Sequence, residues 1–377
     1  MVGGNPAGLA AAERELGLES TTVAFKASPY GYPVDTVVWD DGDRAAVQEL
    51  KRWRFLARAL RDFDVVHFNF GSTIAPQRSP GVAPGETATR LRERIYAGYE
   101  AILEQCDLPL LRRAGKAVFV TFQGDDARQG DVSAHYRVNG AVEAAPGHYT
   151  PASDENKRRR IRRFDRYADG IYALNPDLLH VLPARARFVP YAHVDARGWD
   201  PPAHAEPDRR PVVVHAPTNR EIKGTRFLLE AVSRLQAEGV ELDFRLFEGL
   251  THEELKELYR DADLVVDQLL VGWYGGLAVE AMALERPVVA YLRDEDLGFL
   301  PPEMRAEIPV VSAEPATIYD VLKELLTTRR GELRELGRRG REFVRRWHDP
   351  HRIAEAMRAD YEAAVASRRE RGAPSKA

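Results

Sequence analysis

The sequence predicts an α/β protein made of two doubly wound domains that face each other across a cleft. Short runs rich in Val and Ile, such as 64–70 (DVVHFNF) and 211–216 (PVVVHA), alternate with longer amphipathic segments along almost the whole chain. These runs are continuously apolar, which is typical of parallel strands buried on both faces. A polar, proline-rich stretch at 199–211 separates two series of such runs. Because 377 residues are more than one hydrophobic core usually serves, we expect two domains.

The first domain is predicted to span residues 1–190, and its beginning is unusual. Residues 3–17 (GGNPAGLAAAERELG) indicate a loop and then a helix, with Asn5 as the cap, Pro6 at the first helical position and Gly17 as the stop. A doubly wound domain normally starts with a strand before such a loop, and none precedes it here. We therefore expect that the sheet lacks its first strand or that this strand lies upstream. Further strands are predicted at 21–25, 64–70, 117–122 and 170–174.

The second domain is predicted to span residues 191–350. The Arg-rich segment that begins near 329 indicates a helix with an apolar stripe. The sequence HDP at 348–350 marks a break before one last helix, 351–377, which we expect to pack back toward the first domain. The strands of this domain are predicted at 211–216, 242–247, 263–270, 286–292 and 308–313.

Composition narrows the class of protein. There is one cysteine, Cys106, so a disulfide framework is excluded and a reducing cytoplasm is the expected compartment. The net charge of −4 gives no overall attraction to nucleic acid, and no apolar run approaches the length of a membrane-spanning helix. Two Asp-x-Asp patterns, at 41–43 and 294–296, match a motif that holds metal ions in some enzymes, but both are interpreted as surface turns. We therefore expect a cytoplasmic protein without a bound metal.

The stretch 272–289 (GWYGGLAVEAMALERPVV) indicates an anion-binding helix start in the second domain. Gly275 and Gly276 stand where the helix after the strand 263–270 begins. The first amides of a helix lack internal partners, the helix dipole favours an anion there, and glycines let a phosphate approach these amides. Glu280 lies one turn further in, where a carboxylate suits the hydroxyls of a ribose. The alternative is that Glu280 only complements the dipole and the glycines make a tight turn.

A second helix start in the same domain carries two cations. In 212–235 (VVVHAPTNREIKGTRFLLEAVSRL), Arg220 and Lys223 precede a helix that begins near Gly224 or Thr225. A cation at this place opposes the helix dipole at a cost of about 0.3–1 kcal/mol. An anion bound between the cations and the helix end would account for both side chains, whereas solvated loop charges are the alternative.

The segments 215–225 (HAPTNREIKGT) and 257–291, which contains YGGLAVEAMALERPVVAY, resemble the donor domain of the family-four glycosyltransferases, also called glycosyl transferases group 1. In the first domain, 120–128 (VTFQGDDAR) is similar to a strand-end motif of the same family. The resemblance implies the GT-B fold, with an acceptor-binding first domain and a donor-binding second domain. It also implies a retaining enzyme that transfers a sugar from a UDP-, GDP- or ADP-sugar to a hydroxyl acceptor, without a covalent nucleophile, an obligatory metal or another cofactor.

The resemblance also assigns roles to single residues. Lys223, together with Arg220, matches the residues that bind the donor diphosphate and stabilise the leaving group, although Arg220 lies nearer to Lys223 than the family's arginine does. Glu280 matches the second glutamate of the family's paired-glutamate motif, which binds ribose. The remaining matches are the donor-binding positions Tyr274, Gly275, Gly276 and Leu277, and the glycine loop of the acceptor domain, Gly3 and Gly4.

Two further positions depart from the family pattern. The first glutamate of the pair is replaced by Gly272, and Gln123 stands where the family often has a histidine. Asp267 and Gln268 are candidates to take over part of the missing glutamate's polar role. The departures leave two alternatives open: a sugar phosphorylase or nucleotide-sugar epimerase with the same fold, and a nucleotide-sugar-binding subunit without activity.

Polar residues of the first domain are candidates for the cleft or the acceptor site. His67, Gln123 and Asp126 lie in or just after predicted strands, whose ends line ligand sites in this architecture. A partly buried histidine and an internal salt-bridged loop are the alternatives. The basic run between Lys157 and Arg163 predicts a helix with a buried apolar stripe and a solvated arginine face. Weak contact of this face with an anionic membrane or a phosphorylated acceptor is the alternative.

Overall fold

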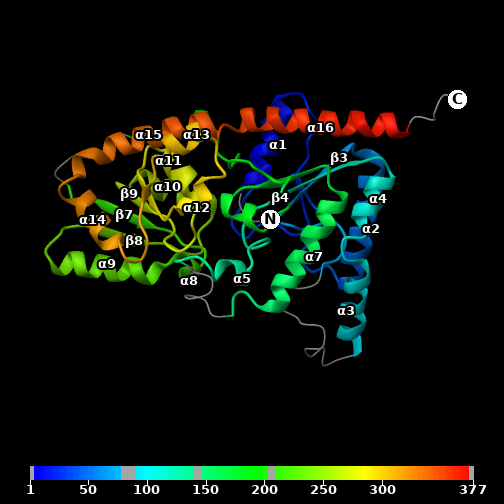
Figure 1. Ribbon diagram of the computed structural model, residues 1–377, viewed down its shortest axis with the longest axis horizontal. Helices are drawn as coiled ribbons and strands as arrows, with labels where there is room; N and C mark the ends of the chain where they lie inside the picture. The colour runs from blue at the N-terminus through cyan, green and yellow to red at the C-terminus, as the bar shows by residue number, and fades with distance from the viewer. Residues whose placement is uncertain (1–3, 78–90, 139–146, 203–208, 373–377) are drawn as a thin grey trace.

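The computed structural model describes residues 4–77, 91–138, 147–202 and 209–372, which form two α/β halves joined along one side by C-terminal helices (Figure 1). Each half has a parallel sheet with helices packed around it. The α/β class predicted from the sequence is therefore confirmed.

The first half is built on a four-stranded parallel sheet with the strand order β3-β4-β5-β6. Every residue of β4 is buried because this strand lies inside the sheet, whereas the edge strand β3 is mostly half-buried. The strands are β3 (Val65–Asn69), β4 (Ala117–Phe122), β5 (Gly170–Ala173) and β6 (Arg187–Phe188). The helices of this half are α2 (Ala45–Asp62), α3 (Leu91–Leu103), α4 (Asp107–Arg113), α5 (Gly130–Ser133) and α7 (Pro151–Tyr167), with a short 3-10 helix, η1 (Pro176–His180).

The described chain opens on helix α1 (Asn5–Glu15), and no strand precedes this helix among residues 4 onward. Asn5 was expected to cap α1, but it is the first helical residue. Its side chain instead accepts a hydrogen bond from the backbone N–H of Ala192, at 2.6 Å. The predicted strand at 21–25 is shortened to β1 (Val23–Ala24), which pairs with β2 (Thr36–Val37) in a separate two-stranded parallel sheet.

The second half is built on a five-stranded parallel sheet with the order β11-β10-β9-β7-β8. Its central strands β7, β9 and β10 are completely buried, as expected for apolar runs covered on both faces. The strands are β7 (Val212–His215), β8 (Asp243–Leu246), β9 (Leu264–Val266), β10 (Val288–Ala290) and β11 (Val311–Ser312). The helices are α8 (Arg220–Lys223), α9 (Thr225–Ala237), α10 (His252–Arg260), α11 (Gly276–Ala283), α12 (Asp294–Leu297), α13 (Pro302–Glu307) and α14 (Ile318–Leu326). Two short 3-10 helices, η2 (Ala196–Gly198) and η3 (Arg330–Glu332), precede β7 and α15.

The last two helices run along one side of both halves (Figure 1). Helix α15 (Leu333–Trp347) packs on α11 in the second half, and α16 (Pro350–Gly372) packs on α1 and β4 in the first half. The contact of α16 is apolar, since Ile353, Ala354 and Met357 share a buried cluster with Leu9 and Phe119. None of the helices in the described ranges combines the length and the apolar character that crossing a membrane requires.

Candidate functional site

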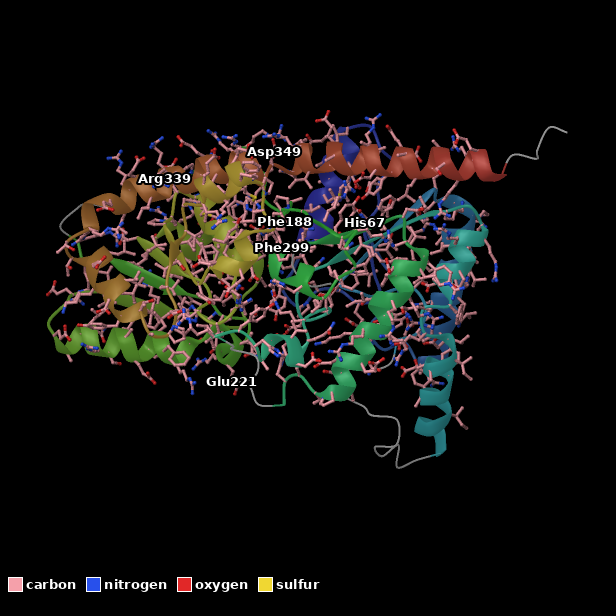
Figure 2. All side chains as sticks on the ribbon, in the orientation of Figure 1. His67, Phe188, Glu221, Phe299, Arg339 and Asp349 are labelled. Atoms are coloured by element: carbon pink, nitrogen blue, oxygen red, sulfur yellow. The ribbon has the colours of Figure 1, made fainter. Side chains whose placement is uncertain are left out.

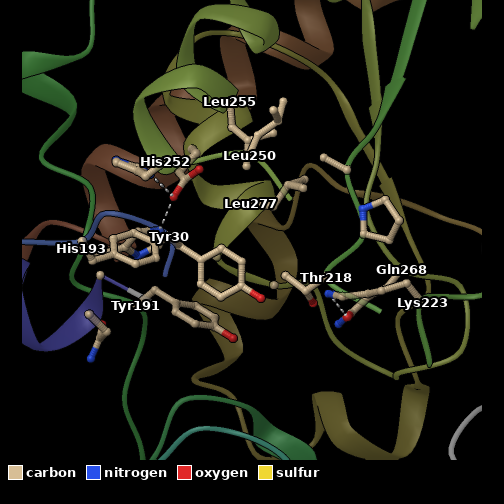
Figure 3. Close-up of a pocket in the computed structure, with 18 of the residues that line it drawn as sticks. Tyr30, Tyr191, His193, Thr218, Lys223, Leu250, His252, Leu255, Gln268 and Leu277 are labelled. Atoms are coloured by element: carbon tan, nitrogen blue, oxygen red, sulfur yellow. Dashed lines mark hydrogen bonds and ion pairs between the residues drawn. The ribbon is translucent and has the colours of Figure 1, made fainter. Parts of the chain in front are cut away.

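A cavity of about 400 Å³ lies between the two halves, where the carboxyl ends of their strands meet (Figure 3). Ligands of doubly wound sheets bind at this edge. From the first half and the connecting segment, the cavity is lined by Gly4, Asn5, Tyr30, Tyr32, Gln123, Arg128, Asn175, Tyr191 and His193. From the second half it is lined by Ala216, Thr218, Lys223, Phe247, Glu248, Leu250, His252, Leu255, Gln268, Gly275, Gly276, Leu277 and Glu280, among others.

The two predicted glycines form the start of α11 at the cavity wall. Gly275 precedes the helix in extended conformation, and Gly276 is the first helical residue. A Cβ atom added at Gly275 would lie 3.2 Å from Asp267 Oδ2 and 3.3 Å from Lys223 Nζ, and one at Gly276 would lie 3.2 Å from the ring of His193. A Cβ atom at either position would therefore press on a neighbouring side chain, and the glycines leave that space to Asp267, Lys223 and His193.

Lys223 lies beside this helix start and is the last residue of the short helix α8, which Asn219 caps through hydrogen bonds to two backbone amides. The Lys223 ammonium lies 3.2 Å from Asp267 Oδ1 and also donates to the amide oxygen of Gln268. The other Asp267 oxygen accepts a hydrogen bond from the Gly275 N–H at 2.5 Å. One buried carboxylate thus holds both groups that the sequence assigned to a phosphate, the ammonium and the first amide of the helix.

Arg220, at the other end of α8, lies apart from this arrangement. Its guanidinium is half-exposed and forms an ion pair with Glu248 on the loop after β8. Glu248 lines the cavity, whereas Arg220 does not. The expectation that Arg220 and Lys223 jointly face one anion does not match this arrangement, because one turn of helix and the pairing with Glu248 direct the arginine elsewhere.

Glu280 also lines the cavity, where it contacts His193 and His252 on the side away from Lys223 in Figure 3, and it is only 3% exposed. Its Oε1 lies 3.2 Å from His193 Nε2 and 3.2 Å from His252 Nδ1 (Figure 3). Burial alone would raise the pKa of Glu280, but the hydrogen bonds from the two imidazoles outweigh burial and the pKa is lowered. Burial likewise acts to lower the pKa of His252, but the hydrogen bond and charge of Glu280 reverse this and raise it. The cavity therefore presents an ionised carboxylate held between two histidines.

Leu277 lines the cavity as predicted for a donor-binding position, whereas Tyr274 does not. Tyr274 is fully buried in the core of the second half, and its hydroxyl is 2.9 Å from His348 Nε2. Its ring stacks on Trp273 with a centroid distance of 4.1 Å. Tyr274 therefore lies in the core of the second half and not on the cavity wall.

Gly272, which replaces the first glutamate of the family motif, is also buried away from the cavity. A Cβ atom at this position would lie 2.5 Å from Arg293 Cβ and 2.8 Å from Asp296 Oδ2. The Arg293–Asp296 ion pair, at 2.8 Å, thus occupies the space next to Gly272. A side chain cannot be accommodated here without displacing this pair.

The first half contributes fewer of its predicted residues. Gly4 and Gln123 line the cavity, and Gln123 Nε2 donates to Asn69 Oδ1 at 3.0 Å; Gly3 lies outside the described residues. Asp126 is buried behind this wall, where it accepts hydrogen bonds from the backbone amides of Gln123 and Gly124. Burial raises the pKa of Asp126 to about 6. Asp126 therefore holds the loop after β4 and is not among the residues that line the cavity.

His67 also lies away from the cavity. Its two ring nitrogens are 2.5 Å from the hydroxyl of Tyr361 and 2.7 Å from that of Thr121, on the side of the sheet that α16 covers. Burial lowers the pKa of His67 to about 4, so the ring is neutral near pH 7. His67, labelled in Figure 2, therefore belongs to the contact of the first sheet with the C-terminal helix and is not among the residues that line the cavity.

The basic run between Lys157 and Arg163 lies on α7 and is largely neutralised within the molecule. Lys157 is buried and donates to the backbone oxygen of Arg128 at 2.6 Å. Arg159 and Arg160 both pair with Glu104, and Arg158 and Arg162 pair with Asp131 and Glu155. The expected solvated arginine face is therefore mostly a set of intramolecular ion pairs.

The two Asp-x-Asp patterns are used in local ion pairs. Asp43 pairs with Lys51, and Asp296 pairs with Arg293 and lies 3.0 Å from His180 Nε2. Within the described ranges, no three His, Cys, Asp or Glu side chains converge as metal ligands would.

Sequence reasoning missed several residues of the cavity. The partners of Glu280 come from distant segments: His193 follows β6, and His252 opens α10, where Thr251 and Glu254 form a capping box. Tyr30 and Tyr32 come from the loop between β1 and β2. The capping pattern at 251–254 was a usable signal for the helix start that places His252, but no local pattern marks the two tyrosines.

The comparisons with known proteins agree with the fold. No family model matches the sequence, and no curated protein matches it. Solved structures are similar over nearly the whole chain. Sucrose-phosphate synthase from Thermosynechococcus elongatus has a TM-score of 0.60 at 16% identity, with 97% of each chain covered. Anabaena HepE, solved in complex with UDP and glucose, has a TM-score of 0.58 at 12% identity, with 96% of this chain and 97% of HepE covered.

A glycosyltransferase from Rickettsia africae ESF-5 has a TM-score of 0.54 at 12% identity, with 97% of this chain and 96% of that chain covered. At this level of identity the likeness concerns the fold. The chain has the GT-B fold, because it forms two Rossmann-like halves with a cavity between them and these structures match it over nearly its whole length.

Proposed function

We propose that the protein is a retaining glycosyltransferase that moves a sugar from a nucleoside-diphosphate sugar to a hydroxyl acceptor. The observation that carries this proposal is the cavity between the halves, which is lined by Lys223, by the glycines at the start of α11 and by the buried Glu280. A diphosphate and a ribose need these two kinds of group, a cation with helix-end amides and a hydrogen-bond-accepting carboxylate.

In this proposal Lys223 and the amides of α11 stabilise the diphosphate as it leaves the sugar. They act where negative charge develops, and their positions are fixed before the reaction by Asn219 and by Asp267. The diphosphate replaces Asp267 as the partner of the Lys223 ammonium. Ionised Glu280, held by His193 and His252, accepts hydrogen bonds from the ribose hydroxyls.

Retention of the anomeric configuration follows if the leaving phosphate accepts the proton of the acceptor hydroxyl on the same face of the sugar. This route needs no carboxylate nucleophile. The acceptor enters from the first half, beside Gln123 and Asn175 at the ends of β4 and β5. The single cysteine, Cys106, and the use of nucleotide-sugars favour the cytoplasm as the place of the reaction.

Gly272 supports a second candidate, a subunit that binds a nucleotide-sugar without turning it over. The donor sugar would lack the carboxylate that the family motif supplies, and the Arg293–Asp296 pair leaves no room for a substitute at this position. Asp267 and Gln268, next to Lys223, are the polar groups that remain near the sugar.

The experiment that separates the two candidates is a turnover assay with UDP-glucose, GDP-mannose and ADP-glucose, each with and without a panel of sugars and sugar phosphates as acceptors. Release of nucleoside diphosphate that depends on the acceptor is the expected result. The anomeric configuration of the product, read by NMR, should equal that of the donor. Binding of a donor without release in the presence of every acceptor favours the binding subunit, and an inverted product contradicts the retaining mechanism.

A further inference from the structure

One segment of the first half crosses the cavity and reaches the second half. The loop between β1 and β2, residues 25–35, is fixed at its end by Asp35, which accepts hydrogen bonds from the backbone N–H and the hydroxyl of Thr22 at 2.7 and 2.8 Å. At its tip, the backbone oxygen of Tyr30 accepts a hydrogen bond of 3.0 Å from the N–H of His252, the first residue of α10. The loop is thus tied to both halves.

The two tyrosines of this loop meet the residues around Glu280. The Tyr32 ring lies against the ring of His252, with centroids 5.0 Å apart, and it also fills the space over Gly4, where an added Cβ would lie 2.9 Å from Tyr32 Cδ1. Burial and the nearby charge of Glu280 raise the pKa of Tyr32, so its hydroxyl stays protonated. Gly31 at the tip has a φ of +73°, a conformation that favours glycine, and a Cβ atom added to it would lie 3.8 Å from Thr251 Cβ.

Tyr30 projects its ring into the middle of the cavity, between the end that holds His252 and the end that holds Lys223 (Figure 3). The ring faces Leu277 on one side and Tyr191 on another in this view. The ring therefore lies beside the space between Lys223 and His252, which contacts Glu280. In the proposed function, the part of the donor at this place is the nucleoside.

We propose that the β1–β2 loop of the first half is part of the nucleoside-binding site, with Tyr30 as the residue that contacts the nucleoside and Tyr32 as the residue that positions His252. This inference rests on the proposed function and adds to it that both halves bind the donor. An aromatic ring beside a nucleoside can stack on the base, and this stacking does not select one particular base, because every base has a π-face.

The test is calorimetric titration of the full chain with UDP, GDP and ADP, and separately with inorganic pyrophosphate, which has the phosphates but no nucleoside. Tyr30→Ala should weaken binding of the tightest nucleoside diphosphate by about 10-fold, within the range for loss of one aromatic contact with a base. Pyrophosphate affinity should change by less than about 2-fold, since Lys223 is held by Asp267 and Gln268, which lie outside the loop. Tyr30→Phe, which keeps the ring, should bind the nucleotide like the wild type.

Tyr96→Ala is the matched control, because Tyr96 lies on the outer surface of the same half and is 41% exposed. It should leave both affinities unchanged. The role of the loop would be overturned if Tyr30→Ala lost nucleotide and pyrophosphate affinity equally, lost neither, or bound the nucleotide more tightly. In each of these cases, nucleotide binding by the wild type would still support the proposed function. Failure of the wild type to bind any of the three nucleotides would overturn both.

Discussion

Replacing Glu280 by glutamine tests the role of the buried carboxylate. Glutamine has the same shape but no charge, so Glu280→Gln keeps an acceptor oxygen for His193 and His252 and removes only the ionic part of both contacts. Hydrogen bonds to charged groups contribute about 1.5–3 kcal/mol each and neutral ones about 0.5–1.5 kcal/mol. Each of the two imidazole contacts should therefore lose about 1 kcal/mol.

The expected loss is about 2 kcal/mol in the free energy of unfolding of the second half. For a domain of this size, each kcal/mol corresponds to about 2–4 °C, so the thermal midpoint should fall by about 4–8 °C. Glu248→Gln is the matched control, since Glu248 also lines the cavity but forms a half-exposed ion pair with Arg220. Such surface pairs contribute about 0–1 kcal/mol, so this variant should differ little from the wild type.

The effect of Glu280→Gln should depend on pH. Glu280 raises the pKa of His252, so this pairing stabilises the folded state fully below the ordinary histidine value of about 6.5. The stabilisation is lost as the pH rises through the raised pKa of His252. The stabilisation is also lost at acidic pH, because Glu280 becomes protonated as the pH falls below the ordinary glutamate pKa and through the lowered pKa of Glu280. Thermal unfolding at pH 6 and pH 9 should therefore show a larger gap between wild type and variant at pH 6. A gap that is equal at both pH values, or larger at pH 9, would refute this account of the carboxylate.

Two further variants test other parts of the site. Lys223→Ala should lower kcat and kcat/KM together by about 100-fold, with a smaller change in the donor KM, because Lys223 acts on the leaving group. Arg220→Ala should have a far smaller effect, since Arg220 pairs with Glu248. A wild-type kcat in Lys223→Ala would place the phosphate site elsewhere. Gly272→Ala should destabilise the protein by about 1–3 kcal/mol through overpacking against Arg293. Gly331→Ala is the control and should not destabilise the protein, because an added Cβ atom meets open space there. Equal thermal midpoints for the two variants would mean that the space beside Gly272 adjusts freely.

The parts of the site that follow from local sequence were predictable. Lys223, Gly275 and Gly276 stand between a buried strand and a helix, and the parallel topology brings these positions to one edge of the sheet. Gly4 lines the cavity because it directly precedes α1, whose start lies at the cavity wall.

The parts that depend on distant partners were not predictable from one sequence. The family resemblance placed Tyr274 at the donor site, but its hydroxyl pairs with His348, far along the chain, and its ring lies in the core. Arg220 turns toward Glu248 for the same kind of reason. His67 was assigned from its strand, yet the helix that carries Tyr361 covers that face of the sheet. Local patterns place the backbone, and the direction of a polar side chain is decided by which partner the fold brings near.

The most direct test of the central claim is a crystal structure of the protein with the nucleoside diphosphate that binds it most tightly. We expect the diphosphate within hydrogen-bonding distance of Lys223 Nζ and the first amides of α11, with Asp267 displaced from the ammonium. We also expect the ribose hydroxyls on Glu280. A nucleotide bound outside this cavity, or bound inside it with the diphosphate at Glu280 and the nucleoside at Lys223, would contradict the claim.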